Sequence, residues 1–255
     1  MIEVKNVEKS FGDSKVLKGV STIFETGKTN LIIGQSGSGK TVLLKSLLGI
    51  HTPEVGSISF DGRIYSELNA DEKRELRTEI GMVFQGSALF DSMTVEENVG
   101  FPLKMFTKKT PAEIKERVNF VIKRVNLVDA NAKKPSELSG GMQKRVAIAR
   151  AIVNNPKYLF CDEPNSGLDP NTAILIDNLI QEITAEYNIT TVINTHDMNS
   201  VMEIGDKIVF LKNGLKAWEG TKDEIFRTDN EAVTDFVYSS ELFKKVREAV
   251  LSEKS

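Results

Sequence analysis

The glycine-rich segment Gly34–Thr41 has the composition of a phosphate-binding loop. Its sequence, G-Q-S-G-S-G-K-T, fits the pattern G-x-x-x-x-G-K-[ST] and follows the apolar run Leu31–Ile33. Glycines let the backbone curl so that its N–H groups point inward at the start of a helix, where an anion is favoured. Lys40 would then reach the β and γ phosphates of a nucleotide, and the Thr41 hydroxyl would ligate Mg²⁺. The alternative, a glycine-rich turn with an exposed lysine, is disfavoured by the position between a strand and a helix.

Two adjacent carboxylates, Asp162 and Glu163, follow the apolar run Tyr158–Cys161. Asp162 could hold Mg²⁺, and Glu163 could polarise an attacking water. By itself such a pair is as easily explained by a helix N-cap or a solvated turn. Because the chain also contains a phosphate loop, the catalytic interpretation is favoured.

A third segment, Leu138–Arg145, has the sequence L-S-G-G-M-Q-K-R and leads into the helical pattern V-A-I-A-R-A-I. Gly140 and Gly141 expose backbone N–H groups at a helix start, and the Ser139 hydroxyl adds another donor. By itself this arrangement is more often a helix cap. Together with the phosphate loop it predicts a second anion site.

The elements around these segments alternate between strand and helix patterns. Such alternation predicts an α/β fold whose parallel sheet has helical crossovers. The turn Asn213-Gly214 between two apolar runs predicts a type I′ hairpin. Short strands are expected within residues 1–33 and at 56–62, 80–84, 157–161, 190–195, 207–212 and 215–219, with helices at 70–77 and 171–186.

The segment from Gly86 to about Lys134 changes character and predicts a helical insert. Thr94–Glu97 and Thr110–Glu113 have the form of capping boxes at helix starts. Thr221–Glu224 predicts a further short helix by the same signal. Apolar residues at helical spacing predict amphipathic helices, one from Ile114, Val118, Val121, Ile122 and Val125, and one or two at the end from Val233, Phe236, Val237, Phe243, Val246 and Val250.

Composition limits the possible functions. A chain of 255 residues with 40% hydrophobic content forms one large domain, or one domain with a subdomain. The net charge of −3 gives no electrostatic footprint for nucleic acid. The single cysteine, Cys161, is expected to be a buried, reduced thiol of a cytosolic protein. Since no signal segment and no long apolar run occur, we expect the chain not to enter or cross a membrane by itself.

The segments in this order resemble the nucleotide-binding subunit of ABC transporters, whose signature is L-S-G-G-Q. The resemblance extends from Ile2 to about Phe226. It implies a P-loop NTPase fold: an ABC-type ATPase domain with a RecA-like mixed sheet core, an antiparallel β subdomain and a helical subdomain. We expect the ATPase domain at 1–228, with the helical subdomain inserted at about 86–155, and a C-terminal helical extension at 229–255.

The resemblance also implies roles for individual residues in Mg²⁺-dependent ATP hydrolysis. Phe11 would stack on adenine with Val16 beside it, where the family more often has tyrosine. Gln85 would contact Mg²⁺ and water, and His196 would contact the γ-phosphate, although each alone suggests a surface or structural residue. The predicted catalytic residues are Lys40, Gln85, Glu163 and His196; the Mg²⁺ ligands are Thr41, Gln85 and Asp162; the ATP-binding residues are Phe11, Val16, Gly34, Gln35, Ser36, Gly37, Ser38, Gly39, Lys40, Thr41, Gln85, Ser139, Gly140, Gly141 and Asp169.

In the family, two chains pair head to tail, and each ATP lies between the phosphate loop of one chain and the signature of the other. We therefore expect a homodimer with two sites, which closes on ATP and drives a membrane permease. Met142 departs from the usual glutamine of the signature. Because the serine and the glycine amides would bind the phosphate, we expect this departure to tune the activity or to affect coupling to the partner, and to leave ATPase function intact.

The segment Gly86–Leu103, G-S-A-L-F-D-S-M-T-V-E-E-N-V-G-F-P-L, is similar to ATPases of the MCE-associated lipid transporters, the Mla (maintenance of lipid asymmetry) type and its chloroplast relatives. Met142 also resembles that group. The similarity implies phospholipid or other lipid cargo, a permease with an MCE-domain partner, and a place on the cytoplasmic face of the inner (plasma) membrane. Leu89, Phe90 and Met93 could offer a partner helix an apolar surface, or could pack the helical insert.

Other functions remain as alternatives. An amino acid or methionine importer, or a lipoprotein-release ATPase, shares T-x-x-E-N-V-x-x-P-L. An ABC ATPase acting on DNA is disfavoured by the acidic charge and by the lack of a coiled-coil insert and zinc-type cysteines. A GTPase is disfavoured because the sequence has no N-K-x-D motif. We expect the tail, 229–251, to contact the second subunit or a partner.

Overall fold

The computed structural model describes residues 1–238 and Lys245 and divides into two compact units. The first contains Met1–Leu68 and the chain from Ile193 onward, and the second contains Asn69–Val192. The expected helical subdomain at 86–155 falls within the second unit. Its limits, like those of the 1–228 domain and the 229–255 extension, stay predictions.

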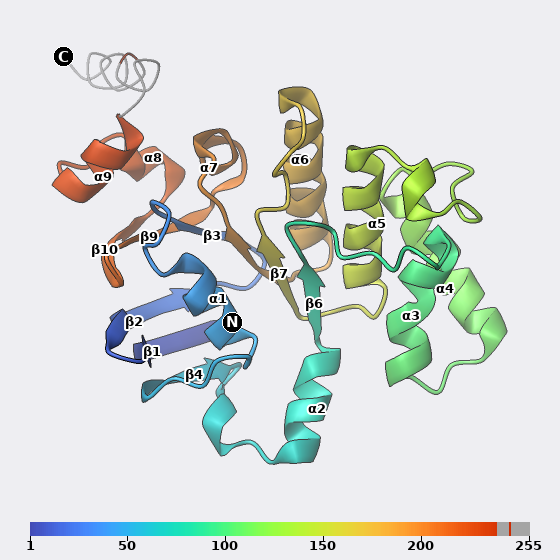
Figure 1. Ribbon diagram of the computed structural model, residues 1–255, viewed down its shortest axis with the longest axis horizontal. Helices are drawn as coiled ribbons and strands as arrows, with labels where there is room; N and C mark the ends of the chain where they lie inside the picture. The colour runs from blue at the N-terminus through green and yellow to red at the C-terminus, as the bar shows by residue number, and fades with distance from the viewer. Residues whose placement is uncertain (239–244, 246–255) are drawn as a thin grey trace. The chain divides into compact units, whose positions relative to one another are not determined.

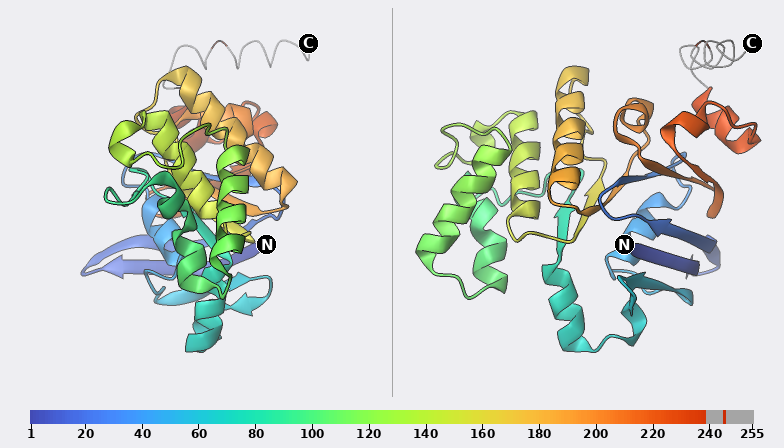
Figure 2. Two further views of the ribbon diagram at one scale, coloured as in Figure 1. Left: turned by 90° about the vertical axis from the view of Figure 1, so that its right-hand side faces the viewer. Right: turned by 180° about the vertical axis from the view of Figure 1, so that it is seen from behind.

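An antiparallel sheet in the first unit has the strand order β2-β1-β4-β5 (Figures 1 and 2). Ile2 of β1 pairs with Phe24 of β2 on one side and with Phe60 of β4 on the other, and all three side chains are fully buried. Alternation of buried and exposed residues therefore gives this sheet one apolar face. The strands are β1 (Ile2–Phe11), β2 (Ser14–Phe24), β4 (Val55–Phe60) and β5 (Arg63–Ile64).

The first unit also contains strands β3 (Thr29–Ile33), β9 (Lys207–Lys212) and β10 (Leu215–Gly220). Strand β3 is buried along its whole length and runs parallel to β9, which pairs with β10 in an antiparallel hairpin. Asn213 and Gly214 both have positive φ, 53° and 82°, which confirms the predicted type I′ turn. The helices of this unit are α1 (Lys40–Leu47), α7 (Met198–Ile204), α8 (Lys222–Ile225) and α9 (Glu231–Val237).

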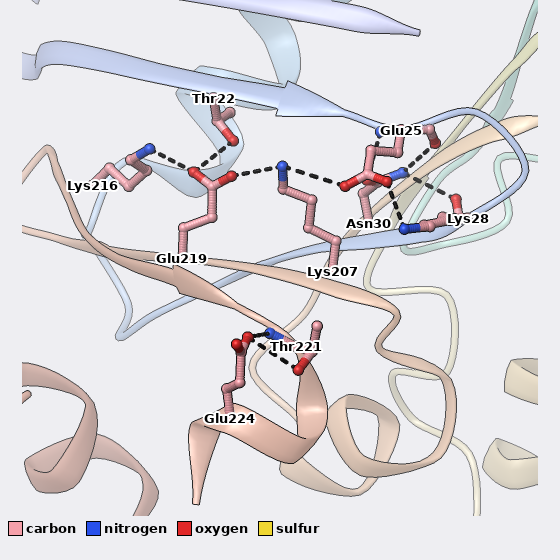
Figure 3. A network of polar contacts seen from close by, with 9 residues as sticks. All are labelled: Thr22, Glu25, Lys28, Asn30, Lys207, Lys216, Glu219, Thr221 and Glu224. Carbon is pink, nitrogen blue, oxygen red and sulfur yellow. Dashed lines mark hydrogen bonds and ion pairs between the residues drawn. The ribbon is translucent and has the colours of Figure 1, made fainter. Parts of the chain in front are cut away.

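A half-buried polar network joins the hairpin to β2 and to the turn that follows it (Figure 3). Lys207 Nζ lies 2.6 Å from Glu219 and 3.7 Å from Glu25, while Lys216 Nζ lies 2.5 Å from Glu219. The Thr22 hydroxyl donates to Glu219 at 3.2 Å. Burial raises the pKa of Glu219, but the hydrogen bonds from Lys207 and Lys216 outweigh burial and hold the pKa below its ordinary value. The network fixes the turn between β2 and β3, and β3 then leads into the phosphate loop.

In the second unit, β6 and β7 are parallel, with Ile80 opposite Tyr158. Helix α5 packs against β6, and α3 packs against both α4 and α5 (Figures 1 and 2). Thr190 N donates to Lys157 O at 3.0 Å at the start of β8, which leads the chain back to the first unit. The elements are α2 (Ala70–Thr78), β6 (Ile80–Val83), α3 (Val95–Phe106), α4 (Pro111–Arg124), α5 (Gly140–Ile152), β7 (Tyr158–Asp162), α6 (Pro170–Glu186) and β8 (Thr190–Asn194), with a 3-10 turn at Pro135–Glu137; the 3-10 turn at Tyr65–Glu67 belongs to the first unit.

The helix-start signals are confirmed. Thr94 and Thr110 form capping boxes at α3 and α4, with Thr94 N donating to Glu97 at 2.8 Å and Thr110 N to Glu113 at 2.7 Å. Thr221 N donates to Glu224 at 2.8 Å at α8. Helix α7 has no counterpart among the predicted elements because its seven residues are too few to show an apolar period.

The predicted final amphipathic helix is confirmed over α9, where Val233 and Val237 are buried and Phe236 lies against Phe210 with ring centroids 5.2 Å apart. The residues Phe243, Val246 and Val250 lie outside the described residues. Cys161 is buried, and burial raises the pKa of its thiol. Of the helices in residues 1–238, none combines the length and apolar character needed to cross a bilayer.

Candidate active site

The phosphate loop joins β3 to α1 in the first unit. Gly34 has a φ of 145°, and a Cβ at this position would lie 2.2 Å from the carbonyl oxygen of Leu211, so only glycine fits. Ser38 N donates to Gln35 O at 3.1 Å and closes the turn. Gly39 is the N-cap of α1, which therefore begins without a hydrogen bond from a capping side chain.

The donors of this loop suit an anion. Lys40 is 8% exposed, and its Nζ donates to Gly34 O at 2.8 Å and to Gln35 O at 3.1 Å. Ser38 Oγ is buried, and no described residue provides it with a hydrogen-bond partner. The first turn of α1 contains no acidic residue. A phosphate group at the uncapped helix start would accept hydrogen bonds from these groups and be favoured by the helix dipole.

Thr41 and His196 lie at neighbouring strand ends in the first unit. Thr195 N donates to Ile32 O at 3.1 Å, which places the end of β8 beside the end of β3. Asn194 Nδ2 donates to Thr41 Oγ1 at 3.5 Å, and His196, two residues later, is exposed. The Thr41 hydroxyl keeps a lone pair for a cation, so its predicted role is chemically feasible.

Phe11 ends β1 with 45% of its side chain exposed. The His51 and Phe11 rings form a T-shaped pair with centroids 5.1 Å apart, and Lys9 Nζ lies 5.4 Å from the Phe11 ring centroid. Val16, on β2, is half-buried. An aromatic ring this exposed could stack on a nucleotide base, and the adenine role of Phe11 and Val16 stays a prediction.

The second unit brings Gln85 and Glu163 together. Gln85 Nε2 donates to Glu163 Oε2 at 2.9 Å and to Ser166 Oγ at 3.3 Å. Glu163 has a φ of 46°, in the left-handed region that is unfavourable for glutamate. Such strain costs about 1–3 kcal/mol and is concentrated at functional sites, which favours the catalytic interpretation over a simple turn.

The donor set also suits Mg²⁺, which prefers oxygen ligands and is commonly held by one or two carboxylates together with substrate phosphates. Because the Gln85 nitrogen faces Glu163, its Oε1 is the atom that can coordinate a cation, an orientation assigned from hydrogen bonding. Asp162 ends β7 half-buried and supplies a carboxylate. Thr41 adds a hydroxyl, so the predicted ligands offer oxygen atoms only.

The predicted second anion site is the start of α5. Ser139 is the exposed N-cap, and its Oγ accepts from Met142 N at 3.3 Å. A Cβ on Gly141 would lie 2.6 Å from Thr172 Cγ2, so the close packing of α5 on α6 also requires glycine there (Figure 1). Ser139 is thus a helix cap, and its ligand role, with that of Gly140 and Gly141, stays a prediction.

Asp169 has a similar position at the start of α6. Its Oδ1 accepts from Thr172 N at 3.1 Å, and these hydrogen bonds with Thr172 lower the pKa of the Asp169 carboxyl. Gln35, Ser36 and Gly37 are exposed at the tip of the phosphate loop. The N-cap of α6 is therefore established for Asp169, and contact with ATP stays a prediction.

The structure adds residues to which the sequence motifs gave no role, namely Asn194 and Lys144. Lys144 Nζ donates to the backbone oxygen of Gln85. A sequence signal for Lys144 exists, because it shares the helical spacing of the apolar Ile148 and lies on the same buried face. Asn194 shows no comparable signal.

Comparisons with known proteins agree with this geometry. A family model described as "ABC transporter" matches residues 17–166. The "Probable ribonucleotide transport ATP-binding protein mkl" of Mycobacterium leprae (strain TN) is 39% identical over 92% of this chain and 68% of its own length. The "Methionine import ATP-binding protein MetN" of Clostridium tetani (strain Massachusetts / E88) is 41% identical over 91% of this chain and 73% of its own length.

A solved structure described as the dimeric structure of a post-hydrolysis state of the ATP-binding cassette MJ0796, bound to ADP and Pi, has a similar fold. It has a TM-score of 0.78 and 34% identity, and it covers 87% of this chain and 99% of its own length. The mixed sheet, the antiparallel sheet and the helices described above are those of such a cassette.

Proposed function

Since this chain belongs to the ABC transporter family and is an ATP-hydrolysing subunit that powers transport, we propose that its cargo is phospholipid or another lipid. The observation that carries this proposal is the segment Gly86–Leu103, whose sequence is similar to the corresponding sequence of the MCE-associated lipid transport ATPases. Met142, in place of the usual signature glutamine, also supports it. The partners are then an integral membrane permease and an MCE-domain protein, with this subunit peripheral on the cytoplasmic face of the inner membrane.

We assign the site residues as follows. The phosphate loop and Lys40 bind the ATP phosphates, Phe11 and Val16 face adenine, and Glu163 activates water while His196 contacts the γ-phosphate. Thr41, Gln85 and Asp162 would hold Mg²⁺, which neutralises charge on the phosphates when bound. The orphaned Ser38 hydroxyl and the Gln85–Glu163 hydrogen bond support these assignments.

We propose further that two copies of the chain share each ATP. Ser139, Gly140 and Gly141 at the start of α5 would bind the γ-phosphate held by the phosphate loop of the second chain, and Asp169 would lie at the same interface. The exposure of Ser139, and a relative of 34% identity whose structure is described as dimeric, support this arrangement. Two-fold symmetry then gives two sites per dimer.

Mixed dimers that carry Ser139→Asp and Glu163→Gln test this arrangement. Aspartate keeps the N-cap of α5 but repels a phosphate, so it removes binding without unfolding the helix. With the two substitutions on different chains, both lesions fall in one site, and we expect about half of the wild-type ATPase rate. With both on one chain, each site carries a lesion, and hydrolysis should be nearly lost.

The two mixed dimers contain the same substitutions, so each is the control for the other. They can be purified through different affinity tags on the two chains, and their ATPase rates compared at saturating ATP. If the dimer with both substitutions on one chain were the more active one, Ser139 would act on the ATP of its own chain, and the shared site would be wrong.

A groove of about 260 Å³ in the second unit is a candidate docking site for the permease. Its lining includes Phe84 and Phe106, which are 44% and 50% exposed, and Phe90, whose ring packs on Phe101 with centroids 4.8 Å apart. Asn98 is buried and stabilises the segment that carries Phe90 at the side of the groove, because its Nδ2 donates to the backbone oxygens of Phe90, Met93 and Thr94. We propose that an apolar helix of the permease enters this groove.

The cargo depends on which permease docks, because substrate does not contact this subunit. Cross-linking from the groove can identify that permease. The single native cysteine is buried, so Phe106→Cys provides one reactive thiol, and Val128→Cys, at a position that is 78% exposed in the same unit, is the matched control. We expect Phe106→Cys, and not Val128→Cys, to capture a polytopic membrane protein from membranes of the source cell.

The captured permease, with its copurifying partners and this subunit, can then be reconstituted in phospholipid vesicles. We expect ATP to accelerate transfer of a labelled phospholipid, and the Glu163→Gln subunit to fail to do so. ATP-dependent uptake of methionine, as for a methionine importer, or of a ribonucleotide, together with unchanged lipid transfer, would overturn the lipid assignment and leave the ATPase assignment intact.

A further inference from the structure

The loop that follows β6 is held by two basic side chains of α5. Lys144 Nζ donates to the backbone oxygen of Gln85. Arg150 donates through Nη2 to Ser87 O and through Nη1 to Ala88 O, each at 2.7 Å. Ser87 and Ala88 have φ values of 62° and 47°, so this loop has a conformation that needs support from outside.

The two basic residues hold neighbouring positions near the start of the loop. Arg150 also lines the groove proposed for the permease, with its guanidinium 5.9 Å from the Phe90 ring centroid. Lys144 instead holds Gln85, whose side-chain amide donates to Glu163 at 2.9 Å. Lys144 is therefore connected to the proposed catalytic carboxylate of Glu163 through one intermediate residue, Gln85.

The environment of Lys144 is unusual for lysine. The side chain is only 5% exposed and lies on the face of α5 that carries Ala147 and Ile148, both fully buried. Burial lowers the pKa of its ammonium, while the nearby Glu163 acts in the opposite direction. Burying an ammonium on an apolar helix face is costly, and the hydrogen bond to Gln85 compensates part of that cost.

We propose that Lys144 is a positioning residue for ATP hydrolysis: it fixes the Gln85 backbone so that the Gln85 amide holds Glu163 in place. The proposal rests on the roles proposed above for Gln85 and Glu163. The ammonium of Lys144 does not contact ATP or water in this scheme. It acts through Gln85, and it connects the helix that starts at Ser139 to the carboxylate that activates water.

Arg145, the next residue on α5, provides a matched comparison. It is half-buried, and its Nη1 donates to the backbone oxygen of Val125 at 2.9 Å, at the end of α4. Like Lys144, Arg145 donates a hydrogen bond to a main-chain carbonyl of another segment. That segment is the end of α4 and not the loop that contains Gln85. A purely structural contribution should be similar for the two residues.

The test measures steady-state ATP hydrolysis and nucleotide affinity on the full-length chain. Lys144→Met keeps most of the apolar stem but removes the donor, and we expect kcat to fall by about 10- to 100-fold, as for a misplaced catalytic group. Binding of a fluorescent ATP analogue should stay within about twofold, because the phosphate loop is unaffected. Arg145→Met should leave both kcat and binding within about twofold.

Two further variants test the route through Gln85. Lys144→Arg keeps a charged donor and should recover most of the kcat lost in Lys144→Met. In a Gln85→Ala background, Lys144→Met should cause little additional loss, because the side chain it positions is gone. Lys144→Gln, which is too short to reach the carbonyl, is measured in parallel so that the test does not depend on the folding of Lys144→Met.

The proposal would be overturned if Lys144→Met and Lys144→Gln lowered kcat no more than Arg145→Met, or if Lys144→Met caused its full loss in the Gln85→Ala background. A drop in nucleotide affinity as large as the drop in kcat would equally exclude a positioning role. Glu163→Gln serves as the reference: if it hydrolysed ATP at the wild-type rate, the assignment of the catalytic carboxylate would fail first, independently of Lys144.

Discussion

Glu163→Gln is expected to lower the rate of ATP hydrolysis by about 10²- to 10⁴-fold, the contribution of a general base, while ATP binding persists. Glutamine has the same shape but cannot accept a proton from water. Its amide still lies within hydrogen-bonding distance of Gln85, so the strained backbone at Glu163 should keep its conformation. Because ATP then stays bound without turnover, a closed dimer should accumulate, which size-exclusion chromatography with ATP would detect.

The matched control is Glu182→Gln, the same chemical change on α6 of the same unit. Glu182 lies 3.3 Å from Arg124 and its side chain is 64% exposed, so we expect little change in hydrolysis or dimerisation. If Glu163→Gln hydrolysed ATP as fast as the wild type, or if Glu182→Gln lost as much activity, the assignment of Glu163 as the residue that activates water would be wrong.

Lys40→Ala is expected to abolish measurable hydrolysis, with a loss in kcat/KM of at least about 10²-fold. The ammonium is held inside the loop by the carbonyl oxygens of Gly34 and Gln35, and there it would meet the β and γ phosphates of ATP. Alanine removes this charge from a nearly dry position, where an ion pair with phosphate is strongest. Nucleotide titration by calorimetry should show weakened ATP binding.

Lys45→Ala on the same helix is the control, since it makes the identical substitution at an exposed position of α1. We expect its ATP affinity and rate to match the wild type. A thermal melt of both variants checks that α1 is intact. Should Lys40→Ala retain ATP affinity and turnover similar to Lys45→Ala, the segment Gly34–Thr41 would not be the phosphate site.

The active-site segments that could be predicted from sequence are those whose geometry is local. The glycine spacing in Gly34–Thr41 fixes the curl of the loop, and the threonine–glutamate pairs at Thr94 and Thr110 fix helix starts through hydrogen bonds between residues three apart. The turn at Asn213 follows equally from its own residue types. In each case the atoms that interact are close in the sequence, so residue types and spacing suffice.

Contacts between segments far apart in the chain could not be predicted in this way. Gln85 and Glu163 are 78 positions apart, Lys144 and Gln85 are 59 apart, and Asn194 and Thr41 are 153 apart. Sequence motifs identified Gln85, Glu163 and Thr41 as site residues but not their mutual contacts. Lys144 and Asn194 are brought to the other site residues only by tertiary packing.

The sequence by itself therefore predicted the chemistry of this protein: a phosphate loop, an acidic pair and a second helix start suited to an anion, each encoded in a few consecutive residues. Only the tertiary structure decided how Glu163 is held, because its positive φ, its hydrogen bond to Gln85 and the support from Lys144 depend on the packing of α5 beside β6. Residue types specify which groups can react, whereas packing specifies which of them meet and which buried donor keeps them in place.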